Sequence, residues 1–293
     1  MKQYKEFLLI GFFIAFGLAF VSCAINPVSG SRELMLMSES KEIELGSQTD
    51  KQVVQQYGIY EDQKLTAYLN GFCQRLAKIS HRPNLDYQLK IVDAAAVNAF
   101  AVPGGYLYFT RGILAHLNSE AELVGVMGHE MGHITARHSA QQYSRAQVAQ
   151  VGLGLGMILS DTFRSFGDLA HYGAQMLFLK FSRDDERQAD DLGVEYSTKT
   201  DYDAAQMASF FQTLERMQPK SDKSGLPGWF STHPNPTDRR ETVAVRAKEW
   251  QQRLGIKEPK INRQQYLKQI DGLVYGEDPK EGYVEGDVFY HPG

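Results

Sequence analysis

The chain has 293 residues, of which 43% are hydrophobic and 23% charged, and its formal net charge is −4. This composition excludes a disordered or collagen-like protein, and the length allows a full hydrophobic core. A slightly negative chain without long basic runs has no electrostatic footprint for nucleic acid. We therefore expect one domain of catalytic size and no nucleic-acid partner.

The N-terminal residues have the organisation of an export signal. Two lysines precede an apolar run over 7–21, which at about 1.5 Å per residue is too short for the roughly 30 Å core of a bilayer. We predict a signal peptide over 1–22, followed by Cys23 as in a bacterial lipobox, where it would be lipidated. Phe20 stands where leucine is usual, and the alternatives are an uncleaved signal anchor or cleavage without lipid.

Helices and a few short strands are predicted along the rest of the body. In chain order they are a helix from Ser38 to about Tyr57, a helix over 64–80, a strand over 85–93, and two strands joined by a turn at 103–105 within 97–114. Helices then predominate to about residue 253. This pattern predicts an α+β fold class, with a small mixed sheet set in a mainly helical body.

The part of the chain after residue 256 is expected to differ from this body. Residues 257–293 contain turn residues and end near the strand-like stretch "YVEGDVFY". We predict an extended tail here, which either wraps the core or begins a further region. The second cysteine, Cys73, lies at an apolar position of its helix and is expected to be buried.

The stretch "GVMGHEMGHITARH", residues 125–138, has the H-E-x-x-H pattern. His129 and His133 share one side of a helix, and Glu130 projects to nearly the same side, so that the two histidines can hold one zinc ion. Ser119 and Glu122 form a capping box that predicts the start of this helix. The alternative is a polar helix face without a metal.

A catalytic zinc ion takes three protein ligands and leaves one position for water. A metzincin would continue with a glycine and a third histidine, but Ala136 and Ser139 occupy those places and His138 is one residue early. Downstream, "FSRDDERQADDLGVEYS" offers Glu186, with Asp190 one turn later on the same face. Glu186 is the predicted third ligand and Asp190 the acceptor of a histidine N–H. A solvated acidic helix face is the alternative.

The predicted cofactor is therefore one Zn²⁺ ion per chain, and Glu130 is the predicted general base. The tetrahedral oxyanion of peptide hydrolysis needs a further donor besides the metal. His233, on the proline-punctuated loop "STHPNPTDRR", is a candidate for that role. An ordinary surface-loop histidine is the alternative.

Five stretches, which together span about residues 26–250, carry a family resemblance. They are "NPVSGSRELMLMSESKEIELG", "NAFAVPGGYLYFTRGIL", "GHEMGHITARHS", "SRDDERQADDLG" and "STHPNPTDRR". Together they resemble the zinc metallopeptidase family of HtpX and the CAAX prenyl proteases, and within it the exported BepA-like and LoiP-like branch. The resemblance implies a gluzincin metallopeptidase domain over 23–256, with the zinc ligands and the base as assigned above.

The resemblance also assigns roles to residues outside the two metal-binding stretches. It implies that His233 can itself occupy the fourth zinc position and hold the enzyme inactive until its loop moves, and that Arg239 lies nearby. It further implies an edge strand that lines the active site and binds an extended substrate backbone by β-augmentation. The residues that match this strand are Asn98, Ala99, Phe100, Ala101 and Val102. Unlike branches with several membrane spans, this sequence has one apolar run, and it shows no tetratricopeptide repeats.

The sequence thus predicts a zinc endopeptidase that hydrolyses unfolded or misassembled envelope proteins. We expect it on the periplasmic side of the bacterial envelope, anchored by its N-terminal lipid or signal. Two alternatives stay open. One is an assembly factor or chaperone for envelope proteins, with a largely dormant zinc site blocked by His233, and the other is a zinc hydrolase of cell-wall peptides.

Overall fold

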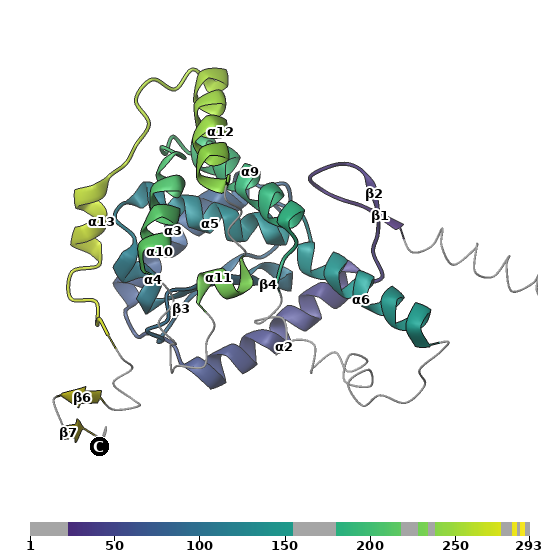
Figure 1. Cartoon of the computed structure of the whole chain (residues 1–293), viewed down its shortest axis with the longest axis horizontal. Helices are drawn as coiled ribbons and strands as arrows, with labels where there is room; N and C mark the ends of the chain where they lie inside the picture. Colours follow the sequence, from purple (N-terminus) through teal and green to yellow (C-terminus); the bar gives the residue numbers. More distant parts are fainter. Residues whose placement is uncertain are drawn as a thin grey trace, which may run out of the picture.

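A computed structural model describes residues 23–154, 180–217, 228–233, 238–276, 283–285 and 288–290. The predicted signal peptide over 1–22 lies outside the described residues. Figure 1 shows the helices and strands. In chain order they are β1 (Cys23–Ile25), β2 (Arg32–Leu34), α2 (Glu39–Tyr57), α3 (Gln63–Ile79), β3 (Gln88–Val92), β4 (Ala99–Val102), the short 3-10 helix η1 (Pro103–Gly105), β5 (Tyr106–Thr110), α4 (Arg111–His116), α5 (Glu120–Thr135), α6 (His138–Gly154), α9 (Arg183–Lys199), α10 (Gln206–Met217), α11 (Trp229–Thr232), α12 (Arg239–Leu254), α13 (Arg263–Gln269), β6 (Tyr283–Glu285) and β7 (Val288–Tyr290).

The small mixed sheet predicted from the sequence is confirmed. Its strand order is β3-β5-β4, with β3 parallel and β4 antiparallel to β5. The strand β4 is therefore an edge of this sheet. The α+β fold class, with a mainly helical body, is confirmed as well.

Side chains alternate between the two faces of the sheet and bury both of them, as the two-residue period of a strand requires. On β5, Leu107 and Phe109 join the main core with α3 and α5, whereas Tyr108 points to the opposite face. There Val53 and Tyr57 of α2 cover it. Figure 1 shows the sheet between α2 on one side and α5 on the other. This layering holds α5 against the inner face of the sheet, next to β4.

The helix starts follow the sequence, with one correction at α5. Ser38 caps α2 as predicted, and the Ser119 hydroxyl accepts from the Glu122 N–H at 3.1 Å. In a capping box the Glu122 carboxylate would accept from the Ser119 N–H. It accepts instead from the Asn118 N–H at 2.7 Å, one residue earlier, so the predicted box is wrong in this half.

The prediction of extended chain after residue 256 is wrong for Arg263–Gln269, which form α13. A single fully buried side chain, Tyr266, holds this helix in the main core, and its hydroxyl donates to the Leu114 carbonyl at 2.6 Å. One buried residue gives no apolar periodicity, which is why the sequence pattern did not indicate a helix. Cys73 is buried as expected.

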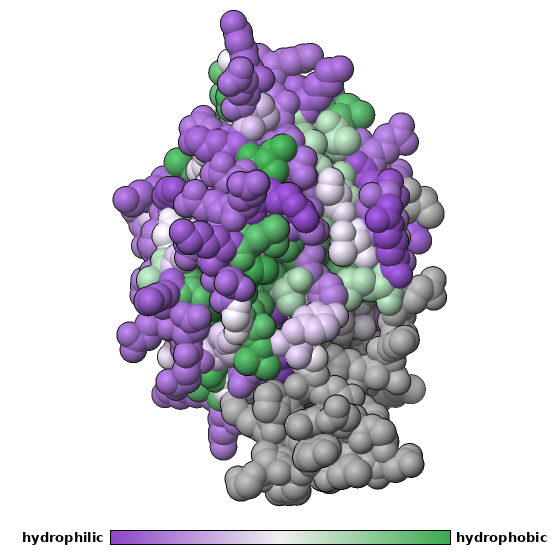
Figure 2. Space-filling view, turned by 90° about the vertical axis from the view of Figure 1, so that its left-hand side faces the viewer, coloured by the Kyte–Doolittle hydropathy of each residue, from purple (hydrophilic) through white to green (hydrophobic). Residues whose placement is uncertain are grey.

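The face seen in Figure 2 is mostly hydrophilic, with apolar side chains gathered mainly along its centre and a few others near its edges. Among the described residues, no helix has both the length and the apolar composition needed to cross a membrane.

Candidate metal centre

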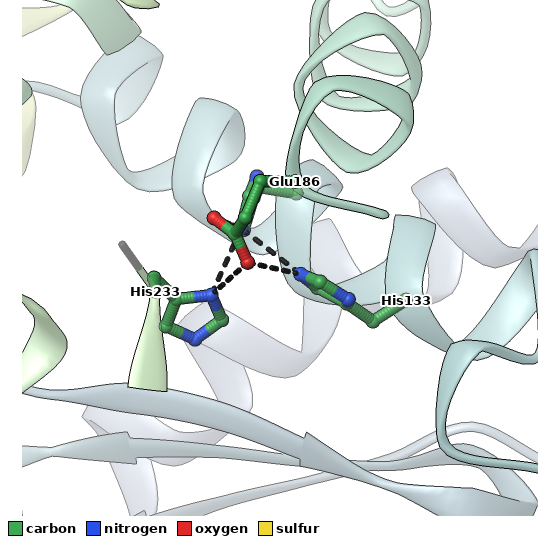
Figure 3. A group of neighbouring side chains, drawn as sticks. His133, Glu186 and His233 are labelled. Atoms are coloured by element: carbon green, nitrogen blue, oxygen red, sulfur yellow. Dashed lines mark hydrogen bonds and ion pairs between the residues drawn. The ribbon is translucent and has the colours of Figure 1, made fainter. Parts of the chain in front are cut away.

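Four buried side chains converge at the centre of the helical body: His129, His133, Glu186 and His233. Each offers one ligand atom, and these atoms all lie within 4.8 Å of one another. The first two come from α5, Glu186 from α9, and His233 follows directly on α11. Figure 3 shows the Glu186 carboxylate between the rings of His133 and His233.

Four of the six separations among these atoms are close to those of a tetrahedral metal site, and all six lie within 4.8 Å. The His129 Nε2 atom lies 3.2 Å from His133 Nε2 and 3.3 Å from His233 Nδ1. The Glu186 Oε1 atom lies 3.4 Å from His133 Nε2 and 2.9 Å from His233 Nδ1. Tetrahedral bonds of about 2.0–2.1 Å place ligand atoms about 3.3–3.4 Å apart. Three imidazole nitrogens and one carboxylate are also the donor types that zinc prefers.

Glycine brings the two ligand-bearing helices together. A Cβ atom at Gly132 of α5 would lie 3.1 Å from the Cα atom of Ala189 on α9, and one at Gly128 would lie 3.1 Å from the Cα atom of Gly193. The backbones of α5 and α9 therefore touch along this line. The close approach sets Glu186 opposite the two histidines, because any side chain at these glycines would push α9 away.

The predicted carboxylate support of a histidine is formed by Asp190 and His129. Asp190 Oδ1 lies 2.8 Å from His129 Nδ1, and Arg239 holds the same carboxylate through two N–H groups at 2.7 and 2.8 Å. Arg239 also lies 3.1 Å from Glu186 Oε2. One buried guanidinium thus neutralises part of the charge of two buried carboxylates, and it lies close enough to His233 to influence the pKa of that ring.

Burial and these neighbours set the protonation of the site. Burial lowers the pKa values of His129 and His133 well below the usual range, so both rings are neutral and keep a lone pair for a metal. Burial acts to raise the pKa of Glu186, but His233 and His133 outweigh it and hold this pKa well below normal. Burial also raises the pKa of Asp190 to about 6 against the opposing effect of Arg239.

Glu130 lies between the four side chains and the edge strand. Its Oε1 atom is 3.5 Å from His233 Nε2, and the backbone of Ala101 in β4 hydrogen-bonds to its carboxyl group. Burial raises the pKa of Glu130 to about 8. The strand β4 comprises Ala99–Val102, and Asn98 precedes it directly. The five residues matched to a substrate-binding strand therefore run past Glu130.

Aromatic side chains that the sequence analysis did not single out pack against the histidines. Trp229 stacks on His233 with ring centroids 4.3 Å apart, and the backbone N–H of Trp229 donates to the Val97 carbonyl just before β4. Phe181 stacks on His133 at 3.9 Å. Phe181 directly precedes the Ser182 cap of α9. Apolar residues at this position often pack against the first turns of the helix, and this pattern could have indicated that Phe181 packs near Glu186.

Residues 63–247 match peptidase family M48 over more than half of the chain. The chain belongs to peptidase family M48. This confirms the resemblance stated from the sequence, and with it the prediction of a metalloendopeptidase.

Curated relatives agree with this assignment. The chain is 27% identical to the beta-barrel assembly-enhancing protease of Yersinia pestis and 26% identical to that of Escherichia coli K12, in each case over 75% of this chain and 47% of the relative. It is 27% identical to the mitochondrial metalloendopeptidase OMA1 of Schizosaccharomyces pombe, over 73% of this chain and 63% of the relative. The chain spans about half the length of the bacterial relatives.

Proposed function

We propose that this chain is a zinc-dependent endopeptidase in which His129, His133 and Glu186 bind one zinc ion and Glu130 is the general base. The observation that carries the proposal is the convergence of the buried donor atoms within 4.8 Å, directly beside Glu130. Neutral histidines and an ionised Glu186 are the protonation states that zinc binding requires.

The proposed reaction places proton transfer on Glu130. Bound zinc supplies a Lewis acid and lowers the pKa of water toward about 7. The Glu130 carboxylate takes a proton from the attacking water as the water oxygen bonds to the peptide carbonyl carbon. The same carboxyl then gives this proton to the leaving nitrogen as the C–N bond breaks. A carboxyl whose pKa is raised by burial is suited to both steps.

The proposed substrate is an extended polypeptide. The strand β4 is an edge of the sheet, and its residues run past Glu130, so a substrate strand paired with it would present its backbone to the base. Backbone hydrogen bonds depend little on the identity of the substrate side chains and need an extended chain, which favours unfolded proteins as substrates. The bacterial relatives are named for enhancing beta-barrel assembly, and this supports envelope proteins.

We also propose a location and a division of the chain. The export signal over 1–22 and lipidated Cys23 would anchor a catalytic domain over 23–256 on the periplasmic side of the envelope. The support is the apolar run and cysteine of the sequence. Metabolic labelling with a radioactive fatty acid would test the anchor, with Cys23→Ser as the blank.

Cleavage of casein, an unfolded protein, by the full-length chain tests the activity. We expect one zinc ion per chain in both the wild type and Glu130→Gln, and a loss of turnover of about 10²- to 10⁴-fold in the variant. Glu44→Gln changes an exposed glutamate on α2 and should leave both quantities unchanged. A Glu130→Gln protein that cleaves casein as fast as the wild type would overturn the proposed base.

The position of His233 favours a second candidate, an assembly factor whose zinc site is dormant. Its Nδ1 atom belongs to the donor set, so it would fill the position that catalysis needs open. If His233 blocks a protease, His233→Ala raises casein cleavage with zinc retained. If His233 is instead an oxyanion donor, the same variant lowers cleavage. No cleavage by either protein, with zinc bound in both, would favour the assembly factor.

A further inference from the structure

A fourth histidine, His138, lies behind the proposed zinc ligand His133. The two Nδ1 atoms are 2.9 Å apart, and the other ring nitrogen of His138, Nε2, lies 2.8 Å from Oε1 of Gln188 on α9. The rings of His133 and His138 are almost completely buried. Two nitrogens at this distance share one proton, so one ring must donate and the other must accept.

A left-handed turn brings His138 to this place. The helix α5 ends at Thr135, and Arg137 has a φ of 59°, which is uncommon for a residue other than glycine. Arg137 is held there by Glu42, 2.8 Å from its Nε atom, and by the Met37 carbonyl at 2.9 Å. The next helix, α6, begins at His138 and directs its ring back towards His133.

Metal binding by His133 decides which ring donates. The lone pair for the ion must be on Nε2, so the proton of the neutral ring is on Nδ1 and donates to Nδ1 of His138. His138 must then carry its own proton on Nε2, where the Gln188 side-chain oxygen accepts it. If His133 binds metal through Nε2, this is the only arrangement in which each hydrogen bond between the three side chains has one donor and one acceptor.

We propose that His138 and Gln188 are positioning residues that fix His133 in its metal-binding tautomer. The inference rests on the proposed function, because it takes His133 as a zinc ligand. Within the described ranges His138 is the hydrogen-bond partner of His133 Nδ1, and Phe181 stacks on the His133 ring. The nearest carboxylate oxygen to His138 Nε2, on Asp185, is 4.0 Å away, and Asp185 caps α9 together with Ser182. The hydrogen-bonded chain from His133 through His138 to Gln188, called the relay below, is therefore built from neutral groups.

The test is the zinc dissociation constant of the full-length chain, measured by competition with a chelator. His138→Phe keeps a ring of similar size but removes the acceptor, and we expect zinc to bind about 10- to 100-fold more weakly. His138→Asn returns an acceptor oxygen close to the Nδ1 position and should restore affinity to within about threefold of the wild type. The melting temperature of each metal-free protein separates this effect from a loss of fold.

Gln188 provides a second pair of variants if His138→Phe does not fold. Gln188→Met removes the acceptor and should weaken zinc binding, whereas Gln188→Glu keeps it and should bind at least as tightly as the wild type. The matched control is Gln141→Met on α6. In the described structure the Gln141 side chain donates to the Ala136 carbonyl and accepts from Arg145, with no hydrogen bond to His133 or His138, so the change should not affect zinc.

Three results would overturn the relay. His138→Phe could bind zinc as tightly as the wild type, His138→Asn could be as weak as His138→Phe, or Gln141→Met could weaken zinc to the same extent. Failure of the proposed function looks different. In that case the wild type binds no zinc, or Glu186→Ala retains it.

Discussion

The two histidines of α5 are held from behind in different ways. His129 faces a carboxylate, Asp190, which is paired with a buried guanidinium. His133, one turn later on the same helix, faces a neutral ring, His138. The first support is charged and draws on α9 and α12, while the second is neutral and draws on α6 and α9.

The charges of the site explain why the supports differ. Three carboxyl groups, on Glu130, Glu186 and Asp190, are buried at the site, and the buried Arg239 guanidinium contacts the last two of them. A fourth carboxylate behind His133 would need another counter-charge, since burying an unpaired charge costs several kcal/mol. A neutral relay orients the second ring without that cost.

Removing the cation breaks the charged side and has the largest expected effect. Arg239→Met leaves Glu186 and Asp190 buried without their partner, so the metal-free protein should lose about 3–5 kcal/mol in its free energy of unfolding by urea. The adjacent Arg240 makes an exposed ion pair with Glu215 at 3.0 Å, and Arg240→Met should cost about 0–1 kcal/mol. Equal losses in the two variants would contradict the charged support.

Changing only the carboxylate weakens the same side without disturbing the packing. Asp190→Asn keeps the size of the side chain but removes the charge that raises the basicity of His129, and zinc should bind about 10- to 100-fold more weakly. Asp191→Asn is the matched control. The Asp191 carboxylate is next in the sequence but half exposed, and it lies 3.4 Å from Arg246. We expect unchanged zinc affinity for this control. A similar loss of affinity in both variants would contradict the role of Asp190 in supporting His129.

Moving α9 sharpens the comparison, because this helix contributes to both supports. Gly132→Ala places a methyl group against the backbone of Ala189 and should cost about 1–3 kcal/mol of stability. It should also weaken zinc binding. Gly71→Ala on α3 meets no atom within 4 Å and should stabilise the protein by about 0.5–1 kcal/mol. Urea unfolding of both variants measures the difference, and a Gly132→Ala protein as stable as the wild type would contradict the close approach.

The charged side was predictable from the sequence, whereas the neutral side was not. His129, His133, Glu186 and Asp190 lie at helical spacing within two local stretches, and local spacing is what a sequence pattern records. The strands β4 and β5 and the glycine turn between them could likewise be predicted from the local sequence. The orientation of His138 depends on a left-handed Arg137, which is held by Glu42 from 95 positions earlier in the chain. No local pattern contains that contact.

The two errors elsewhere in the chain have different causes. The Asn118 N–H competes with the Ser119 N–H for the Glu122 carboxylate, and the choice is made by the geometry of the turn before α5. The helix α13 forms around one buried tyrosine that meets a carbonyl of α4. In the second case the deciding partner lies 152 positions away in the chain, outside any local residue pattern.

Anomalous diffraction at the zinc edge from crystals of the zinc-loaded, full-length chain would locate the metal directly. We expect one strong peak per chain, enclosed by Nε2 of His129, Nε2 of His133 and the Glu186 carboxylate. A peak elsewhere, or none at that point in crystals shown to contain zinc, would contradict the proposed zinc site.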